Sequence, residues 1–359
     1  MKPPLVAPAW PNYFKYFILL ASTVLTVYVV VILQAIIKPL LAAFIFALLL
    51  RPFCTRLEKW KVPRALSTLL SMLLVVIVIS GILTFFSTQV ADITSDMNSL
   101  VTTFEKLFDR LRQWTSATFG IEPHQQVDYI RSSTVALLKN STSFFSNTLS
   151  ATAGFFTSFV LFLLGLFFSL YYRKFWVDFI YLLFEPANHP KLKQTLLRIE
   201  VVVKKYILGL GIVILTMAAL NTLGLLLLGI KHAIFFGVLV ALMTIIPYVG
   251  IIIASSIPVL FALATMPSIW YPIGVIAVFS LVQFLEGNFI TPNIVGNQVS
   301  INPFAALLGL FAGGMLLGII GVIFAIPLLA IIKAICDHVD SLKPIGFVLG
   351  NPPVKAKKG

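Results

Sequence analysis

The chain has 359 residues, of which 59% are hydrophobic and 11% are charged, and its mean hydropathy is +1.01. These values exclude a soluble globular domain and are typical of an integral membrane protein. The formal net charge is +13, but the 26 lysines and arginines are scattered between apolar segments. This scatter argues against a nucleic-acid partner and favours topology signals and contacts with anionic lipid headgroups. Because only helices satisfy their backbone groups within a single segment in lipid, the apolar runs predict an all-α polytopic fold.

The N-terminal part, residues 1–87, predicts three transmembrane helices at about 16–33, 35–50 and 65–86. The first run is too long for a removable signal peptide and lacks a convincing cleavage site. The loop after the second helix is basic, with Arg51, Arg56, Lys59, Lys61 and Arg64 against Glu58 alone. By the positive-inside rule we expect this loop, and with it the N-terminus, to be cytoplasmic.

Residues 88–152 are too polar to span a membrane and predict an amphipathic extramembrane helical segment. Its apolar residues alternate steps of three and four, a heptad seam formed by Val90, Ile93, Met97, Leu100, Phe104, Leu107, Leu111 and Trp114. Such a helix pairs with copies of itself, lies on the membrane surface or packs within its own subunit. Contact between subunits is the use that we favour, and the other two remain open.

Residues 153–205 predict a fourth transmembrane helix at about 155–172, followed by an amphipathic helix at about 191–205. The second helix is expected to lie on the cytoplasmic membrane surface, where its basic residues meet anionic lipid. Glu200 within it is expected to pair with Lys204 one turn later rather than to act as a catalytic group.

Residues 206–335 are predicted to form a transmembrane transport core, and residues 336–359 a basic cytoplasmic tail. After a span at 206–229, the runs 233–265 and 303–335 would each be about 50 Å long as straight helices, against a hydrocarbon core of about 30 Å. Both contain prolines and glycines. Counting each run as one kinked crossing gives about eight transmembrane helices, and a hairpin in either run is the alternative.

Another span begins near Tyr271 and carries Glu286 about fourteen residues further on. A carboxylate inside a membrane is costly unless it is hydrated, paired or protonated, so it is a functional hypothesis by default. The alternative is a helix-end residue wetted by headgroups. Gln283 and Asn288 accompany Glu286, and Pro292 and Gly296 predict a broken loop whose carbonyls and amides could bind a polar solute or a cation.

A second group of candidate site residues surrounds Pro247, which lacks an N–H and therefore interrupts its helix. We expect a new half-helix to begin near Gly250, with its N-terminal dipole available to an electronegative group. Ser255 and Ser256 could add hydroxyl donors, although serines within spans often bond to their own helix.

The sequence contains no HExxH, GxSxG or phosphate-cradling GxxxxGK[ST] motif. The two cysteines, Cys54 and Cys336, are too few for a disulfide framework and fit no metal-ligand spacing, and the four histidines are isolated. The sequence therefore predicts neither an enzyme nor a cofactor or metal site.

The segments IPYVGIIIASSIPVLFAL and EGNFITPNIVGNQVSINPFAALLGLFAGGMLLGIIGVIFAIPL resemble the C-terminal signature of the autoinducer-2 exporter family of bacterial inner-membrane proteins. Its most specific element, E-x-N-x-I-x-P-x-x-x-G, is met by Glu286, Asn288, Ile290, Pro292 and Gly296. The resemblance implies about eight helices per subunit and a homo-oligomer, with a pentamer as the expected form. It also implies export of a small furanone-type signalling molecule, sodium or lithium exchange for protons, or efflux of other small solutes.

These observations predict an inner-membrane transporter, either an exporter or an ion-coupled antiporter of a small polar solute. Glu286 is expected to alternate between protonated and charged forms and so to couple proton or sodium movement to the solute. A passive oligomeric channel and a non-transporting scaffold remain as alternatives. The expected partners are the solute or ion, membrane lipids and further copies of the chain.

Overall fold

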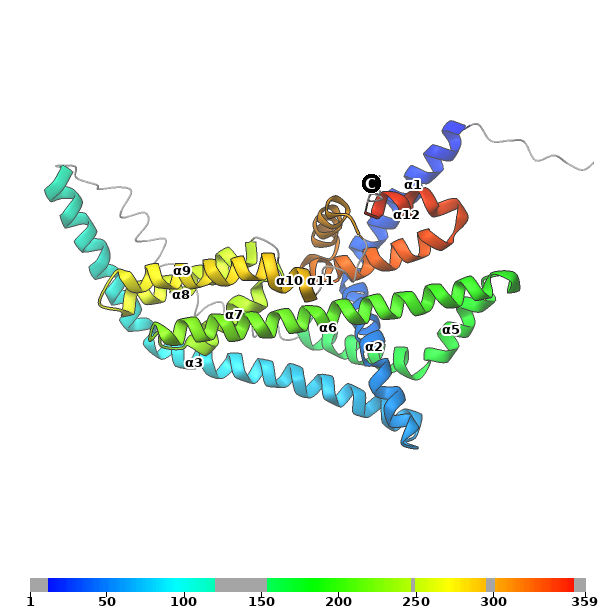
Figure 1. The fold of residues 1–359 in the computed structure, drawn as a ribbon, viewed down its shortest axis with the longest axis horizontal. Coiled ribbons are helices and arrows are strands. Elements are labelled where there is room, and N and C mark those ends of the chain that lie inside the picture. Colours follow the sequence, from blue (N-terminus) through cyan, green and yellow to red (C-terminus); the bar gives the residue numbers. More distant parts are fainter. Residues whose placement is uncertain (1–11, 120–153, 247–248, 295–300, 352–359) are drawn as a thin grey trace, which may run out of the picture.

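The computed structural model describes residues 12–119, 154–246, 249–294 and 301–351, and all regular secondary structure within these ranges is helical. Six of the described helices are long and apolar enough to cross a membrane, and three shorter apolar helices accompany them. The predicted all-α polytopic membrane fold is therefore confirmed. Figure 1 shows an elongated molecule in which α3, α6 and α9 run along the long axis.

The N-terminal region consists of α1 (Asn12–Ile32), α2 (Gln34–Lys59) and α3 (Arg64–Phe119). α1 is exposed along most of its length. α2 and α3 pack with the helix Gly154–Tyr171 around a buried apolar cluster formed by Ala43, Ala47, Leu50, Val75, Phe162, Leu166 and Leu170. Residues 162, 166 and 170 repeat every four positions, so the same face of their helix is buried.

α3 continues without interruption from the predicted third span into the predicted heptad segment. Its final part projects away from the other helices at one end of the molecule (Figure 1). The side chains of residues 94–119, and all of residues 120–153, lie outside the described part of the chain. Val90 and Ile93, at the start of the heptad seam, pack against a cluster of the same subunit, and the use of the rest of the seam stays a prediction.

α6 (His189–Leu227) unites the predicted surface helix 191–205 with the following span in a single helix of 39 residues. It follows α5 (Arg173–Leu182) and the short η1 (Pro186–Asn188). Val203 is fully buried in one cluster with Ile45 of α2 and Phe324 of α11. The expectation of a helix on the membrane surface is wrong, because its apolar face packs against other helices of the chain.

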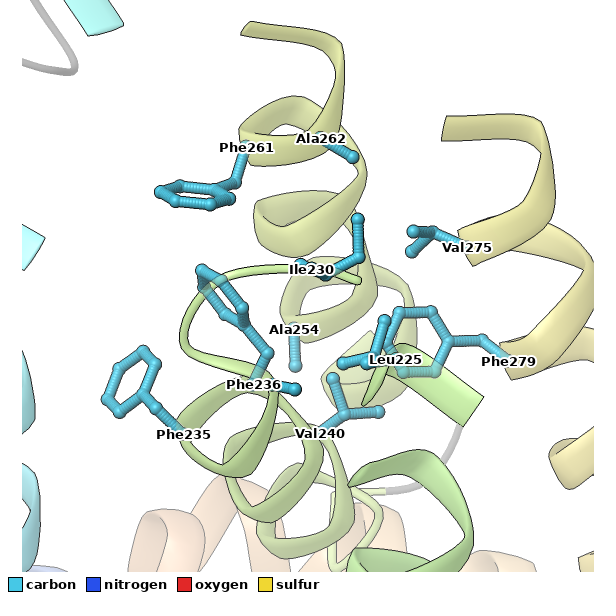
Figure 2. Close-up of a cluster of buried hydrophobic side chains, with 11 residues drawn as sticks. Leu225, Ile230, Phe235, Phe236, Val240, Ala254, Phe261, Ala262, Val275 and Phe279 are labelled. Carbon is cyan, nitrogen blue, oxygen red and sulfur yellow. The ribbon is translucent and has the colours of Figure 1, made fainter. Parts of the chain in front are cut away.

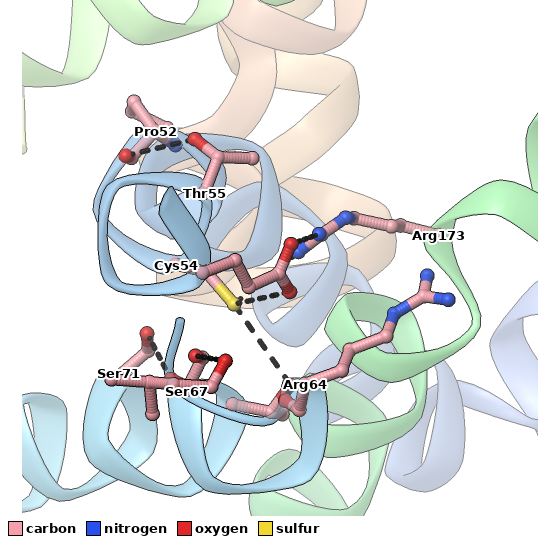
Figure 3. A network of polar contacts seen from close by, with 10 residues as sticks. Pro52, Cys54, Thr55, Arg64, Ser67, Ser71 and Arg173 are labelled. Carbon is pink, nitrogen blue, oxygen red and sulfur yellow. Dashed lines mark hydrogen bonds and ion pairs between the residues drawn. The ribbon is translucent and has the colours of Figure 1, made fainter. Parts of the chain in front are cut away.

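Polar contacts hold the start of α5 and the long α6 to α2. Glu200 forms an ion pair with Arg51 of α2, whereas the sequence predicted Lys204 as its partner. Arg173 forms an ion pair with Glu58, and its guanidinium lies 3.3 Å from the Sγ atom of buried Cys54 (Figure 3). The contacts of Arg173 lie where α2, α3 and the start of α5 meet.

The run 233–265 is a helical hairpin made of α7 (Ala233–Met243) and α8 (Val249–Thr265). The rings of Phe236 and Phe261 are 5.1 Å apart, although the two residues are 25 positions apart and would be about 37 Å apart in a straight helix. Figure 2 shows both rings in the cluster that also holds Leu225 of α6 and Phe279 of α9. The prediction of one kinked crossing is therefore wrong for this run.

The run 303–335 is also a hairpin, formed by the two arms of α11 (Pro303–His338). The chain reverses at Gly318, whose φ of 63° is readily available only to glycine. A Cβ atom added at Gly313 would lie 2.5 Å from the carbonyl oxygen of Gly321, so the two arms touch backbone to backbone. Gly309 likewise contacts Leu329, 20 positions away.

The C-terminal end folds back onto the start of this second hairpin. After η3 (Asp340–Leu342) and α12 (Lys343–Leu349), the carbonyl groups of Val348 and Gly350 accept hydrogen bonds from the side-chain amide of Asn302. Asn302 also caps α11 by accepting a bond from the backbone N–H of Ala305, at 2.8 Å.

With two hairpins in place of two kinked helices, six helices remain as candidates for a single crossing. They are the long apolar helices α2, α3, Gly154–Tyr171, α6 and α9 with its continuation, and the shorter α1. Each hairpin returns the chain to the side from which it entered or adds two crossings. If each of the six candidates crosses once, the number of crossings is even in both cases.

Candidate functional site

Glu286 lies at the first position of a π-helical turn, η2 (Glu286–Ile290), between α9 (Trp270–Leu285) and α10 (Thr291–Ile294). The backbone N–H of Thr291 donates to the carbonyl of Glu286, five residues earlier. The helix thus continues through Pro292 to Ile294, where a loop was predicted, and the rest of the predicted loop lies outside the described residues. The wider turn accommodates a proline ring that would clash with the preceding turn of an α-helix, and such turns are frequent at functional sites.

Two side chains donate hydrogen bonds to the half-buried carboxylate of Glu286. The Nε2 atom of Gln283 lies 2.8 Å from Oε2, and the hydroxyl of Thr291 donates to Oε1. Asn288 instead donates to the carbonyl of Phe284, at 2.9 Å, and is exposed. The structure therefore brings together Gln283, Glu286 and Thr291, and it leaves Asn288 outside this group.

The tip of the first hairpin lies at the level of this turn. Ala241, near the end of α7, packs in one cluster with Met217 of α6, Val282 of α9 and Ile290 of η2. The end of α7, which leads to the predicted group around Pro247, therefore lies at the level of Glu286. Pro247 itself and Gly296 lie outside the described residues.

Gly250 is buried at the start of α8, near the position where a new half-helix was expected. A Cβ atom at this position would overlap the carbonyl oxygen of Met243, so the turn is closed to any larger residue. That carbonyl accepts a bond from the N–H of Ile246, at 3.0 Å. It has therefore exchanged its helical partner for one within the turn.

Ser255 and Ser256 bond to their own helix. Their hydroxyls donate to the carbonyls of Ile252 and Ile253, at 3.3 and 2.7 Å. This is the arrangement that serines in spans often adopt, and neither hydroxyl contacts Glu286 in the structure.

Sequence reasoning missed Asn221, which lies on α6 in a buried stripe with Val213, Met217 and Leu225. The side chain is fully buried, and neither its Oδ1 nor its Nδ2 has a hydrogen-bond partner among the described residues. The sequence pattern that could have revealed Asn221 is its place in a series of apolar residues spaced four apart. Within the described ranges, no group of three or more His, Cys, Asp or Glu side chains could hold a metal ion.

A family model for AI-2E family transporters matches residues 20–341, which include every described element of the site. The chain belongs to the AI-2E transporter family. It is accordingly a multi-pass membrane transporter, and the resemblance carried by the Glu286 motif is confirmed.

Three relatives match the AI-2E chain over most of their length. It is 28% identical over 332 residues to MT0215 of Mycobacterium tuberculosis, with 91% of this chain and 89% of the relative covered. It is 28% identical over 321 residues to YueF of Bacillus subtilis, with 85% and 84% covered. Both names propose transport without naming a solute. The AI-2 transport protein TqsA of Escherichia coli is 24% identical over 346 residues, with 95% and 96% covered.

Proposed function

We propose that this AI-2E transporter is an exporter or ion-coupled antiporter of a small polar solute, and that Glu286 is its coupling group. The observation that carries the proposal is a carboxylate held by two side-chain donors inside an apolar helix, at the level of a hairpin tip. An ionisable group at such a place is costly and is retained where it serves ion or proton movement.

The hydrogen bonds of Glu286 give protonation a structural effect. A charged carboxylate accepts bonds from Gln283 and Thr291 at its two oxygens. When it takes a proton, one oxygen becomes a donor and no longer accepts as before. One of the two contacts must then reverse, with the hydroxyl of Thr291 or the amide oxygen of Gln283 accepting from the new O–H, in a turn that packs near the end of α7.

The proposed localisation, oligomeric state and solute rest on the distribution of basic residues and on similarity to the family. We place the protein in the bacterial inner membrane with its N-terminus in the cytoplasm, because the loop between α2 and α3 is basic. We further propose that it works as a homo-oligomer, with a pentamer as the first form to test, in contact with anionic lipids. AI-2, which TqsA is named for, is the first solute to test.

The proposal predicts that Glu286→Gln abolishes proton coupling, because the amide cannot exchange a proton. The measurement is AI-2 and proton flux in proteoliposomes under an imposed pH gradient, with sodium present or absent. Glu185→Gln is the matched control, since Glu185 is exposed next to the short η1. It should leave both fluxes unchanged.

Retained flux with unchanged pH dependence in Glu286→Gln would contradict the role of Glu286. Flux that rises linearly with the gradient without saturating, together with conductance in a planar bilayer, would instead favour a passive channel.

A further inference from the structure

Asn221 is a fully buried amide in the middle of an apolar contact. One turn before it, Met217 packs with Val282 of α9, and one turn after it, Leu225 packs with Val275 and Phe279. Figure 2 shows Leu225 directly beside Phe279. The amide therefore faces a helix interface in which an unpaired polar group costs free energy.

Gln283 lies at the same level of this interface. Moving from Leu225 to Asn221 goes one turn along α6, and moving from Phe279 to Gln283 goes one turn along α9 in the same direction, since the two helices are antiparallel. The contact between Gly224 and Val278 sets a register in which Asn221 lies opposite residue 281, so that Asn221 and Gln283 differ by about 3 Å along the helix axes. The Oε1 atom of Gln283 is buried without a partner among the described residues, while its Nε2 atom holds Glu286.

The unpartnered atoms define the ligand that fits them. Asn221 offers one acceptor and an amide donor, and Gln283 offers a second acceptor. A cation would leave the amide donor of Asn221 unsatisfied, and an anion would leave both acceptors unsatisfied. A neutral molecule that both donates and accepts fits all three atoms, and water is the molecule that proteins use for this purpose.

We propose that Asn221 and Gln283 bind internal water between α6 and α9, and that this water carries protons to Glu286. The proposal rests on the proposed coupling role of Glu286 and extends it to a path along the α6–α9 interface. Asn221 is a positioning residue in this path, because it holds the water and does not exchange a proton itself.

The test is X-ray radiolytic footprinting read out by mass spectrometry, in which radicals formed from bound water oxidise the nearest side chains. Met217 is the reporter, since it is 1% exposed and one turn from Asn221. In Asn221→Leu, which keeps a similar shape, we expect its oxidation to slow about tenfold. Thr216→Val is the matched control, since the Thr216 hydroxyl already bonds to the carbonyl of Ile212 at 2.8 Å.

Proton flux and thermal unfolding of the same variants complete the test. Asn221→Leu should unfold at a lower temperature, because it removes a ligand of the water and leaves the buried Oε1 atom of Gln283 without its partner, while proton flux falls about tenfold. If the variant does not fold, the oxidation rate of Met217 in the wild type still tests the water site. There, Met217 should be oxidised at least as fast as half-buried Met72, which packs against an apolar cluster.

Unchanged oxidation of Met217 in Asn221→Leu, or a raised unfolding temperature, would overturn the water site. Slower oxidation with normal proton flux would overturn the proton path. Because footprinting does not depend on transport, a wild type without proton flux would refute the coupling role of Glu286 and leave the water site standing on the oxidation data.

Discussion

At the scale of single residues, one of the two hydrogen bonds to the Glu286 carboxylate comes from Thr291, which lies close enough only because the helix widens to a π turn. Thr291→Val keeps the branched shape and removes the hydroxyl that donates to Oε1. We expect the free energy of unfolding to fall by about 1–3 kcal/mol, the usual cost of losing a hydrogen bond to a charged group. Thermal unfolding in detergent measures it. Thr265→Val is the control, because that hydroxyl bonds to the carbonyl of Phe261 in its own helix.

A Thr291→Val variant as stable as Thr265→Val would show that the bond contributes nothing to the fold. The sequence could predict Glu286 with Gln283, because residues three apart share a helix face. It could not predict the contact with Thr291, since residues five apart meet only where the helix widens. Asn221 was missed because the fourfold spacing shows which face is buried but not which polar group on it lacks a partner.

At the scale of elements, the second hairpin depends on the close approach of Gly313 and Gly321. In Gly321→Ala the new methyl group would meet the carbonyl of Gly313, so the arms must separate, and we expect a loss of about 1–3 kcal/mol in unfolding free energy. Gly211→Ala in α6 is the control. A Cβ there meets no atom within 4 Å, and alanine favours a helix by up to about 1 kcal/mol over glycine. Equal unfolding temperatures for the two variants would contradict the tight hairpin.

The sequence analysis located the prolines and glycines that interrupt the two long apolar runs, but it did not predict that the chain reverses direction there. A proline or glycine within an apolar run is compatible with a kink and with a turn, because it removes a hydrogen bond or frees the backbone without setting the new direction. The direction is decided by tertiary contacts, such as those of Phe236 with Phe261 and of Gly313 with Gly321. The prediction of a membrane-surface helix at 191–205 was wrong for a related reason. The amphipathic first half of α6 fits a membrane surface and a protein surface equally well, and α2 and α11 cover it.

At the scale of the whole molecule, α2 joins the N-terminal helices to the transport core. One face packs with α3 and the helix Gly154–Tyr171, and another packs with α6 and α11 through Ile45, Val203 and Phe324. The ion pair between Arg51 and Glu200 lies across the contact between α2 and α6. The site around Glu286 packs against the C-terminal half of α6 through Met217, beside the first hairpin. The N-terminal helices thus support the transport core from one side and supply none of the described side chains that hold Glu286.

The long α3 provides the last prediction, because its heptad seam continues beyond Val90 and Ile93, which pack against the cluster of the first hairpin. A seam of this kind needs an apolar partner, and a second copy of the same helix is the one that we favour. The double substitution Leu100→Glu and Leu107→Glu should therefore convert the assembly to single subunits, as measured by native mass spectrometry. Lys106→Glu, which changes charge off the seam, should leave the mass unchanged. An assembly that survives the seam substitutions would instead assign the seam to the membrane surface or to its own subunit.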